Sequence, residues 1–406
     1  MSYQGNRDGS RDDMMQIQEV KHKEALTSNY AVAYAVKAAD VDVIAVYPIT
    51  PQTTIVEKLA EFVANGELNA ELIHVESEHS ALSAVVGASA TGARVFTATS
   101  SQGLEYAHEI LHIASALRLP IVMAVPARAL SAPISIHGDY SDVMNARDTG
   151  WVIYIVASAQ EAYDTIIQAY RLAESVYLPV MVAYDGFLMS HTVEPVELND
   201  ESEVRKFLPR QIRPYTLNPK RPVTMGPLAS PDWYYEFKYQ QVLALREAYK
   251  VAKEVDVAYG SKFGRSYGVV ETYKIEDADY ALVTYGGAAY GNARIAADRA
   301  REKGIAAGVI RVRLYRPFPT LEILKALEGV KAFAVVDRAI MFGSPAEGPL
   351  YKDIATAMYM NGIDKPAINI IHGIGQRTIY VEDLYKVYTM LKDRPGKEVV
   401  FMGVRI

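Results

Sequence analysis

Two residues that could take part in binding or catalysis lie in the stretch Ala45–Ala81, where apolar runs give way to helical segments. Thr50 precedes Pro51, an order typical of a helix N-cap followed by proline at the first helical position. Because a helix N-terminus presents free N–H groups, Thr50 marks either an anion site or an ordinary helix start. Glu78 precedes a helix rich in small residues, Ala81–Ala90, which can pack tightly and leave the carboxylate poorly hydrated. Such an acid has a functional role or simply complements the helix dipole.

Arg128 follows the apolar run Ile121–Val125. An arginine at the carboxyl end of a strand can hold a small carboxylate through two parallel hydrogen bonds. A structural ion pair would explain this residue equally well. We interpret Arg147 and Asp148, farther along the chain, as a structural pair in a turn.

Three other groups resemble ligand-binding motifs but have unsuitable spacing. The run Glu76–His79 crowds two acids and a histidine into one turn, without the helical HExxH spacing, so we predict no metal site there. Gly286–Gly291 lies between a predicted strand and helix but lacks the endings of phosphate loops, which favours a tight turn. Asp139 and Asn145 are too close in sequence to serve as the two halves of a diphosphate–magnesium motif.

Short, almost continuously apolar runs alternate with helical segments through the first half of the chain. Such runs are typical of parallel strands that are buried on both faces, and their alternation with helices predicts an open α/β sheet. Ligands of such sheets bind beyond the carboxyl ends of the strands. The predicted strands are Val41–Tyr47, Leu72–Val75, Val95–Thr99, Ile121–Val125, Ile153–Val156 and Val180–Tyr184, and the predicted helices are Thr53–Ala64, His79–Gly92, Leu104–Leu117 and Ala159–Val176. The last helix opens with a capping box, Ser158 to Glu161.

The sequence divides into four parts. Residues 1–25 are expected to be a disordered tail, 26–188 a first α/β domain, 189–265 an irregular connector followed by a helix at about Tyr234–Val255, and 266–406 a second α/β domain. The strands of the second domain are predicted at Tyr280–Tyr285, Gly308–Leu314, Phe333–Val336 and Ile368–Ile371, and its helices near Asn292–Lys303, Thr320–Leu327, Leu350–Met360 and Val381–Leu391.

The composition narrows the function classes. With 406 residues, 50% hydrophobic and 22% charged, the chain is typical of a globular protein with two domains. A net charge of -6 argues against nucleic acid or an anionic membrane as the main partner. The chain has no cysteine, so it can supply no thiolate to zinc or to an iron–sulfur cluster. Without an apolar leader or membrane-length run, we expect a cytoplasmic protein.

Several motifs together resemble one known family. They are YPITPQTT (Tyr47–Thr54), VESEHSA (Val75–Ala81), FTATSSQGL (Phe96–Leu104), ARALSAP (Ala127–Pro133), RDTGW (Arg147–Trp151) and LYRPFP (Leu314–Pro319). In this order they are similar to the α subunit of pyruvate:ferredoxin oxidoreductase, also called pyruvate synthase, from about residue 26 onward. The resemblance implies an open parallel sheet of the pyrimidine-binding type found in thiamine-diphosphate enzymes, plus an α/β domain like the C-terminal domain of transketolase.

The resemblance also implies roles for residues and partners. Glu78 matches the catalytic glutamate that hydrogen-bonds N1′ of the thiamine aminopyrimidine, and Ile49, Ser101 and Gln102 match further cofactor contacts. Thr50 and Arg128 match the residues that hold the 2-oxo acid. A β subunit would share the thiamine diphosphate and supply the Mg²⁺ site, and partner subunits would hold the [4Fe-4S] clusters. The implied assembly contains β, γ and δ subunits, as a dimer of heterotetramers, and uses coenzyme A and ferredoxin.

Three alternatives to a pyruvate enzyme stay open. Branched-chain 2-oxoacid:ferredoxin oxidoreductases share YPITPQT and VESEHSA, and Ile49, His137 and Tyr140 are candidate positions around the substrate methyl group. A non-catalytic assembly subunit would keep the fold, with Glu78 as a structural acid. A transketolase-like enzyme would transfer acyl or ketol groups without ferredoxin.

Overall fold

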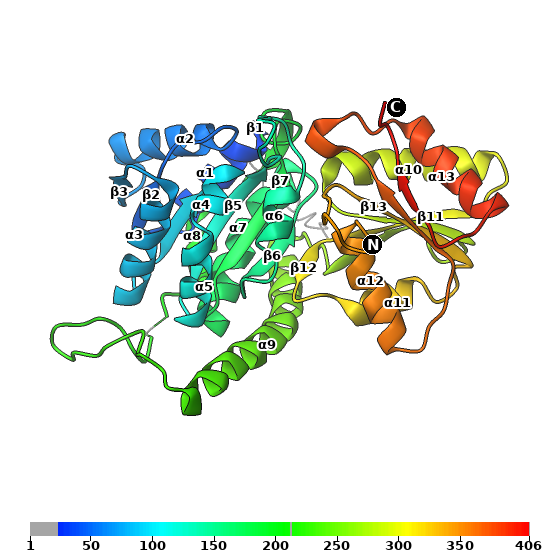
Figure 1. Ribbon diagram of the computed structural model, residues 1–406. Coiled ribbons are helices and arrows are strands. Elements are labelled where there is room, and N and C mark those ends of the chain that lie inside the picture. Colours follow the sequence, from blue (N-terminus) through cyan, green and yellow to red (C-terminus); the bar gives the residue numbers. More distant parts are fainter. Residues whose placement is uncertain (1–22, 212, 406) are drawn as a thin grey trace, which may run out of the picture.

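A computed structural model of the chain describes residues 23–211 and 213–405, which form two α/β domains (Figure 1). The sheet of the first domain has seven strands in the order β12-β6-β7-β5-β4-β2-β3. Its strands are β2 (Val43–Val46), β3 (Glu71–His74), β4 (Val95–Ala98), β5 (Ile121–Ala127), β6 (Val152–Ile155), β7 (Val180–Asp185) and β12 (Leu314–Arg316). All neighbours pair in parallel except β12, which is antiparallel to β6. The predicted open parallel sheet is therefore confirmed.

Helices cover both faces of this sheet. Successive residues of one strand pack into different core clusters, since Ile44 joins the cluster beneath α1, α2 and α7 while Ala45 joins the cluster beneath α3 and α5. This two-sided burial explains why the strands read as continuous apolar runs. The helices are α1 (Ser28–Ala38), α2 (Thr53–Ala64), α3 (Glu78–Thr91), α4 (Gln102–Tyr106), α5 (His108–Ala116), α6 (Ser141–Asn145) and α7 (Ala159–Val176).

The second domain has a six-stranded sheet in the order β15-β14-β13-β10-β11-β9, parallel except for β9. The strands are β9 (Val270–Tyr273), β10 (Tyr280–Thr284), β11 (Ala307–Val312), β13 (Ala332–Asp337), β14 (Ala367–Ile371) and β15 (Val399–Phe401). One cluster packs α10 and α13 against the sheet, and another packs α11 and α12. These helices are α10 (Gly287–Glu302), α11 (Thr320–Ala326), α12 (Pro349–Met360) and α13 (Val381–Asp393), and a short 3-10 turn, η1, spans Ile374–Gln376.

The strand predicted over Gly308–Leu314 was wrong in its extent. It consists of two strands in different sheets, because the chain leaves the second domain at Arg313 and β12 pairs with β6 of the first. Arg313 is fully buried between the sheets and donates to Glu161 of α7 across 2.8 Å. The same core cluster continues from the first domain into the second, so the two domains share a packed interface.

The connector contains more regular structure than predicted. Strand β8 (Val193–Glu197) pairs with β1 (Lys23–Thr27), α8 spans Glu201–Phe207, and α9 runs over 33 residues, Pro231–Phe263, well beyond the predicted helix. The tail predicted at residues 1–25 extended too far, since Lys23 already belongs to β1, and residues 1–22 lie outside the described residues. Within the described chain, no helix is both long and apolar enough to cross a membrane.

Candidate active site

The loops that carry the predicted site residues meet at one edge of the first sheet. Thr50 follows β2, Glu78 follows β3, Ser101 follows β4 and Arg128 follows β5. These four strands are consecutive in the order β5-β4-β2-β3, and all are parallel, so their carboxyl ends lie side by side. This edge is where open α/β sheets bind ligands.

Glu78 is the first residue of α3, and its side chain is 9% exposed. Its carboxylate lies against Gly103 of α4, where an added Cβ would be 2.5 Å from Glu78 Oε1 and 2.5 Å from Thr99 Oγ1. The Thr99 hydroxyl is buried and, like the Glu78 carboxylate, has no hydrogen-bond partner among the residues that the structure describes. Glu78 is thus held by packing, with its oxygens free to meet a group from outside the chain.

Arg128 is buried, and its side chain spans two loops. Nε donates to the carbonyl oxygen of Ser135 at 2.9 Å and Nη1 to that of Thr50 at 3.0 Å. Burial lowers the pKa of Arg128 from its usual high value, but a guanidinium stays protonated at neutral pH. Nη2 has no hydrogen-bond partner in the described chain, which leaves one arm of the fork available for an acceptor.

The structure brings Thr50 to Arg128 but not as an N-cap. Helix α2 begins at Thr53, as the predicted helix bounds had it but two residues later than the proline signal implied, and Gln52 occupies the cap position. The physical reason is a contact from another helix: Asn29 of α1 donates to Pro51 O at 2.7 Å and holds the chain in a turn. Thr50 is exposed, and its backbone carbonyl, rather than its side chain, meets the arginine.

The turn after β4 is held by an acid that the sequence analysis missed. Asp142 of α6 is fully buried, and its Oδ2 accepts from the backbone N–H groups of Ser101 at 2.8 Å and Arg128 at 3.0 Å. Burial raises the pKa of Asp142 to about 7. The Ser101 hydroxyl lies within 2.6 Å of Ala129 O and 2.7 Å of Gln102 Oε1. The only sequence signal was an acid directly before the apolar pair at 143–144.

The remaining candidates divide between the site and the interior. Ile49 is half-buried in the same turn as Thr50, and its carbonyl accepts from Gln52 N. His137 is exposed beside Phe187. Tyr140 was wrongly placed at the substrate, because it is fully buried at the domain interface with its ring 5.1 Å from that of Tyr285.

Comparisons with known proteins show the family to which the chain belongs. Residues 34–257 match the family described as "Pyruvate flavodoxin/ferredoxin oxidoreductase, thiamine diP-bdg", and residues 278–384 match "Pyruvate:ferredoxin oxidoreductase core domain II". The chain is 45% identical over 387 residues to the pyruvate synthase subunit PorA of Methanocaldococcus jannaschii, covering 94% of this chain and 98% of the relative. The chain belongs to the α subunits of the pyruvate and 2-oxoacid:ferredoxin oxidoreductase family.

Two kinds of oxidoreductase in this family are equally similar. The ketoisovalerate oxidoreductase subunit VorA of Pyrococcus horikoshii is also 45% identical, over 372 residues, covering 91% of this chain and 94% of the relative. Among solved structures, a 2-oxoglutarate:ferredoxin oxidoreductase from Magnetococcus marinus matches with a TM-score of 0.68 and 20% identity, covering 92% of this chain and 66% of that one. A split-gene transketolase matches with a TM-score of 0.54 and 13% identity, covering 90% of this chain and 98% of that one. Both support the predicted fold class.

The glycine loop and the predicted structural pair behave as the sequence indicated. In this α subunit, the N-terminus of α10 is occupied by the carboxylate of Asp185 from β7, which accepts from Gly287 N at 2.7 Å and Ala288 N at 3.2 Å. Arg338 forms a buried ion pair with the same Asp185. The loop is therefore a tight turn that joins the domains. Arg147 Nε lies 3.7 Å from Asp148 Oδ2, and the two residues form a structural ion pair.

The acidic residues near these loops are engaged separately. Asp139 accepts from Gly375 N at 2.9 Å, whereas Asn145 donates to Glu105, so the two do not face a common ion. An HExxH motif that the sequence analysis overlooked lies on α5, from His108 to His112. Among residues 23–211 and 213–405, no group of three or more histidine and acidic side chains is close enough to hold a metal.

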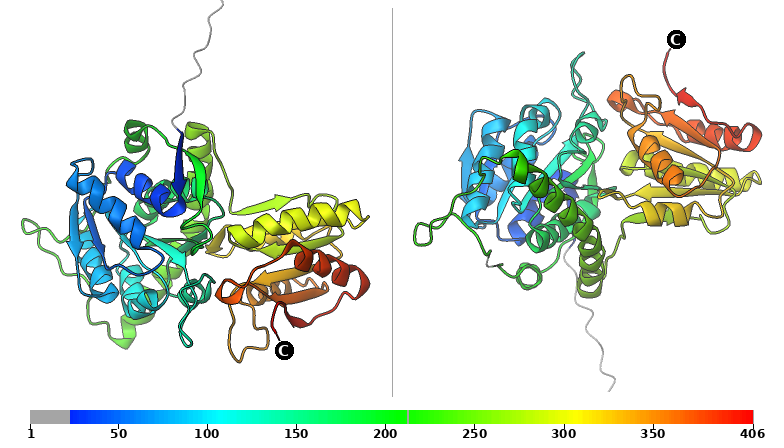
Figure 2. Two further views of the ribbon diagram at one scale, coloured as in Figure 1. Left: turned by 90° about the horizontal axis from the view of Figure 1, so that it is seen from above. Right: turned by 60° about the horizontal axis from the view of Figure 1, so that its bottom comes forward.

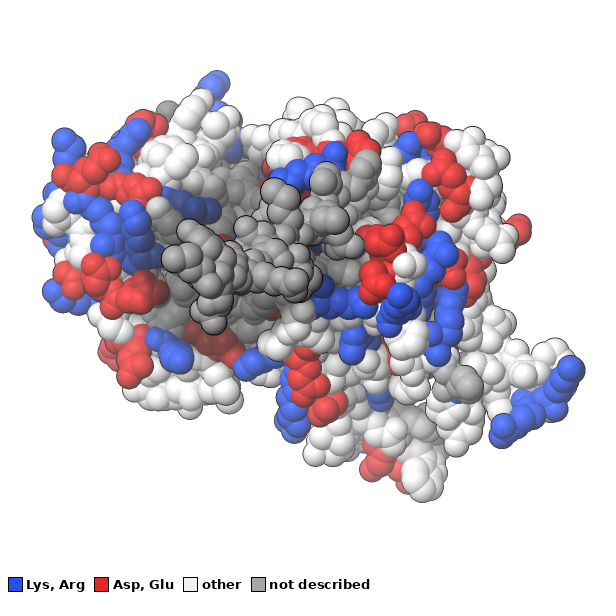
Figure 3. Space-filling view, turned by 180° about the vertical axis from the view of Figure 1, so that it is seen from behind, with Lys and Arg blue, Asp and Glu red and all other residues white. Residues whose placement is uncertain are grey.

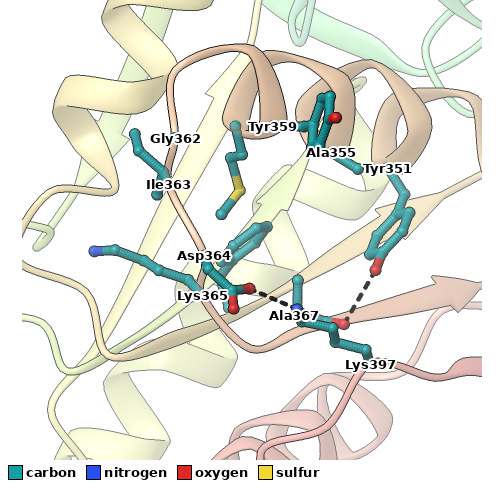
Figure 4. Close-up of a pocket in the computed structure, with 11 residues that line it drawn as sticks. Tyr351, Ala355, Tyr359, Gly362, Ile363, Asp364, Lys365, Ala367 and Lys397 are labelled. Atoms are coloured by element: carbon teal, nitrogen blue, oxygen red, sulfur yellow. Dashed lines mark hydrogen bonds and ion pairs between the residues drawn. The ribbon is translucent and has the colours of Figure 1, made fainter.

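Two cavities differ in their relation to the site. One of about 720 Å³ lies between the domains, lined by the loop that follows Arg128, by Arg147, and by Lys352 and Ile374 of the second domain. Another, of about 400 Å³, lies at the outer edge of the second domain beside Tyr351 and the Asp364–Lys397 ion pair (Figure 4). No predicted site residue lines the outer cavity, so the first-domain edge stays the candidate active site.

Proposed function

We propose that this chain is the α subunit of pyruvate:ferredoxin oxidoreductase, which converts pyruvate and coenzyme A reversibly to acetyl-CoA and CO₂ and passes the electrons to ferredoxin. The identity of 45% to a pyruvate synthase subunit over nearly the whole of both chains carries this proposal. The equal identity to a ketoisovalerate subunit makes 2-oxoisovalerate the second candidate substrate. The chemistry is the same for both acids, and only the side chain to be accommodated differs.

The residues around Glu78 fit a bound aminopyrimidine. Thiamine diphosphate, when bound, supplies the nucleophilic carbon that attacks the keto group and accepts the electron pair left by CO₂. Glu78 would hydrogen-bond N1′ and hold a proton there, a role suited to a buried carboxylate without another partner in the described chain. Beside Glu78, Gly103 leaves room because it has no Cβ. Thr99 offers a buried hydroxyl donor that has no partner in the described chain. Ile49 and the Ser101–Gln102 turn would complete the contacts of this subunit with the cofactor.

The residues around Arg128 fit the substrate carboxylate. Nε and Nη1 are fixed by the Ser135 and Thr50 carbonyls, so the free Nη2 is held in place rather than left to rotate. A charge-assisted hydrogen bond from Nη2 would orient the carboxylate for loss as CO₂. Thr50, exposed at the same turn, would line the substrate side of the pocket.

The complex would need further subunits. The chain has no cysteine, so the [4Fe-4S] clusters that carry electrons to ferredoxin would belong to partner subunits. Asp139 and Asn145 are engaged elsewhere, which fits a Mg²⁺ and diphosphate site on the β subunit. We propose β, γ and δ partners, assembled as a dimer of heterotetramers.

The decisive experiment is to purify the complex through this chain and measure reduction of ferredoxin or viologen with coenzyme A and either 2-oxo acid. Strong preference for pyruvate supports the proposal, and preference for 2-oxoisovalerate replaces the substrate only. Reduction without dependence on coenzyme A, or ketol transfer without ferredoxin, would exclude this function. Full activity in a complex assembled with Glu78→Gln would favour a non-catalytic assembly subunit.

A further inference from the structure

A projecting arm, residues 213–243, touches the first domain at Arg213 and Leu217, which donate to Ser89 O and Ala90 O, and at Met225, which packs against the core cluster beneath α3 and α5. It comprises the loop before α9 and the first turns of that helix, and the loop projects outward in Figures 1 and 2. None of residues 214–240 is buried. The first buried position of α9 is Gln241, so ten residues of helix precede its packing against the chain.

The arm is rich in large apolar side chains despite this exposure. Trp233 is 65% exposed, Tyr235 is 77% exposed and Leu228 is completely exposed. Monomeric proteins rarely expose contiguous apolar surface of this kind, and aromatic anchors are enriched at protein interfaces. The composition therefore indicates a surface that another protein covers.

The helical part of the arm presents rings on two flanks. At 100° per residue, Trp233 and Phe237 fall on one flank, and Tyr235 and Tyr239 fall about 200° away on the other. A flat surface could cover only one flank. A partner that covers the rings on both flanks would enclose the helix in a groove.

The charge of the arm restricts the chemistry of that groove. The loop part of the arm, residues 213–230, contains no acidic residue, and its Lys220 and Arg221 at the tip are exposed without an ion-pair partner in the described chain, whereas the helical part carries Asp232 and Glu236 beside Lys238. The tip is visible as the basic projection of the molecule (Figure 3). A complementary surface would carry carboxylates at its rim.

The cavities described on this chain are a poor match for this requirement. Four of them each contain more lysine and arginine than aspartate and glutamate, including the one that holds Arg147 and Lys352 and the one that holds Lys365 and Lys397. None of these four cavities of a second copy would offer an excess of carboxylates to a basic tip. We infer that the arm docks into an apolar groove with an acidic rim on a different polypeptide of the complex, an inference that rests on the proposed function for the existence of that complex.

The absence of cysteine makes the test direct. Leu228→Cys and Tyr235→Cys each introduce the single thiol of this chain, and Met360→Cys, at an exposed position of α12, is the matched control. Maleimide labelling is followed by the intact mass of this chain, alone and in the purified complex. We expect at least tenfold slower labelling of the arm thiols in the complex, with the control unchanged. Equal rates in the two states would overturn the inference.

A crosslinker attached to the Leu228→Cys thiol identifies what covers the arm. Adducts with an acidic segment of a different polypeptide support the inference, and adducts with a second copy of this chain overturn it. Lys220→Glu with Arg221→Glu should reduce co-purification of the partner severalfold, less so at high salt, whereas Lys303→Glu should not. Unchanged co-purification of the double variant would refute the acidic rim. Since none of these readouts is activity, a complex that fails to oxidise 2-oxo acids would refute the proposed function alone.

Discussion

Gly103→Ala is the sharpest perturbation of the proposed active site. The new Cβ would stand 2.5 Å from both Glu78 Oε1 and Thr99 Oγ1, whereas ordinary contacts begin at 3.4 Å. The carboxylate or the helix must therefore move by about 0.9 Å. A displacement near 1 Å at a reacting group costs about 10²-fold in rate. We expect kcat to fall by about that factor, while the free energy of unfolding falls by only about 1–3 kcal/mol from overpacking.

Gly87→Ala on α3 is the matched control, because a Cβ there meets nothing within 4 Å. Alanine favours a helix over glycine by about 1 kcal/mol, so this variant should keep wild-type kcat and be no less stable. The assay is steady-state ferredoxin reduction by the assembled complex, with urea unfolding of each α subunit. Wild-type kcat in Gly103→Ala, with the control behaving as expected, would refute the assignment of Glu78 to the reaction.

Three further predictions concern single side chains. Glu78→Gln keeps the size of the residue but not the carboxylate, so kcat should fall at least about 10²-fold with assembly intact by native mass spectrometry, and retained activity would contradict it. Arg128→Lys cannot reach both Ser135 and Thr50 while presenting a third donor, so KM for the 2-oxo acid should rise about tenfold, and an unchanged KM removes Arg128 from the carboxylate site. Asp142, with its pKa raised to about 7, binds a proton more tightly in the folded state, so wild-type stability should fall by a few kcal/mol as the pH rises from about 4 to about 7; Asp142→Asn should lose the share due to Asp142, while Asp337, whose pKa burial also raises to about 7, keeps its own share. Parallel urea unfolding profiles of the two proteins across that range would show that the shift is absent.

Local pattern was enough to predict the frame of the site. The apolar runs identified the parallel strands because both faces of each strand are buried, and the helices between them placed the ligand edge at the carboxyl ends. Glu78 and Arg128 followed from that edge, since each comes directly after a strand. The capping signal at Ser158 was also correct, because its hydroxyl accepts from Glu161 N at 3.1 Å within one helical turn.

The sequence by itself determined what depends on neighbours along the chain: strand and helix types, the sheet edge that carries the candidate site, the family motifs and the lack of thiolate ligands. Only the tertiary structure decided what depends on partners far away in sequence. Glu161, read locally as a cap, also holds Arg313 from 152 residues later, and Thr50 is turned from a cap by Asn29. Asp142 ties two site loops through hydrogen bonds across 41 and 14 residues. Such contacts leave no local periodicity, because they exist only after the sheets have packed.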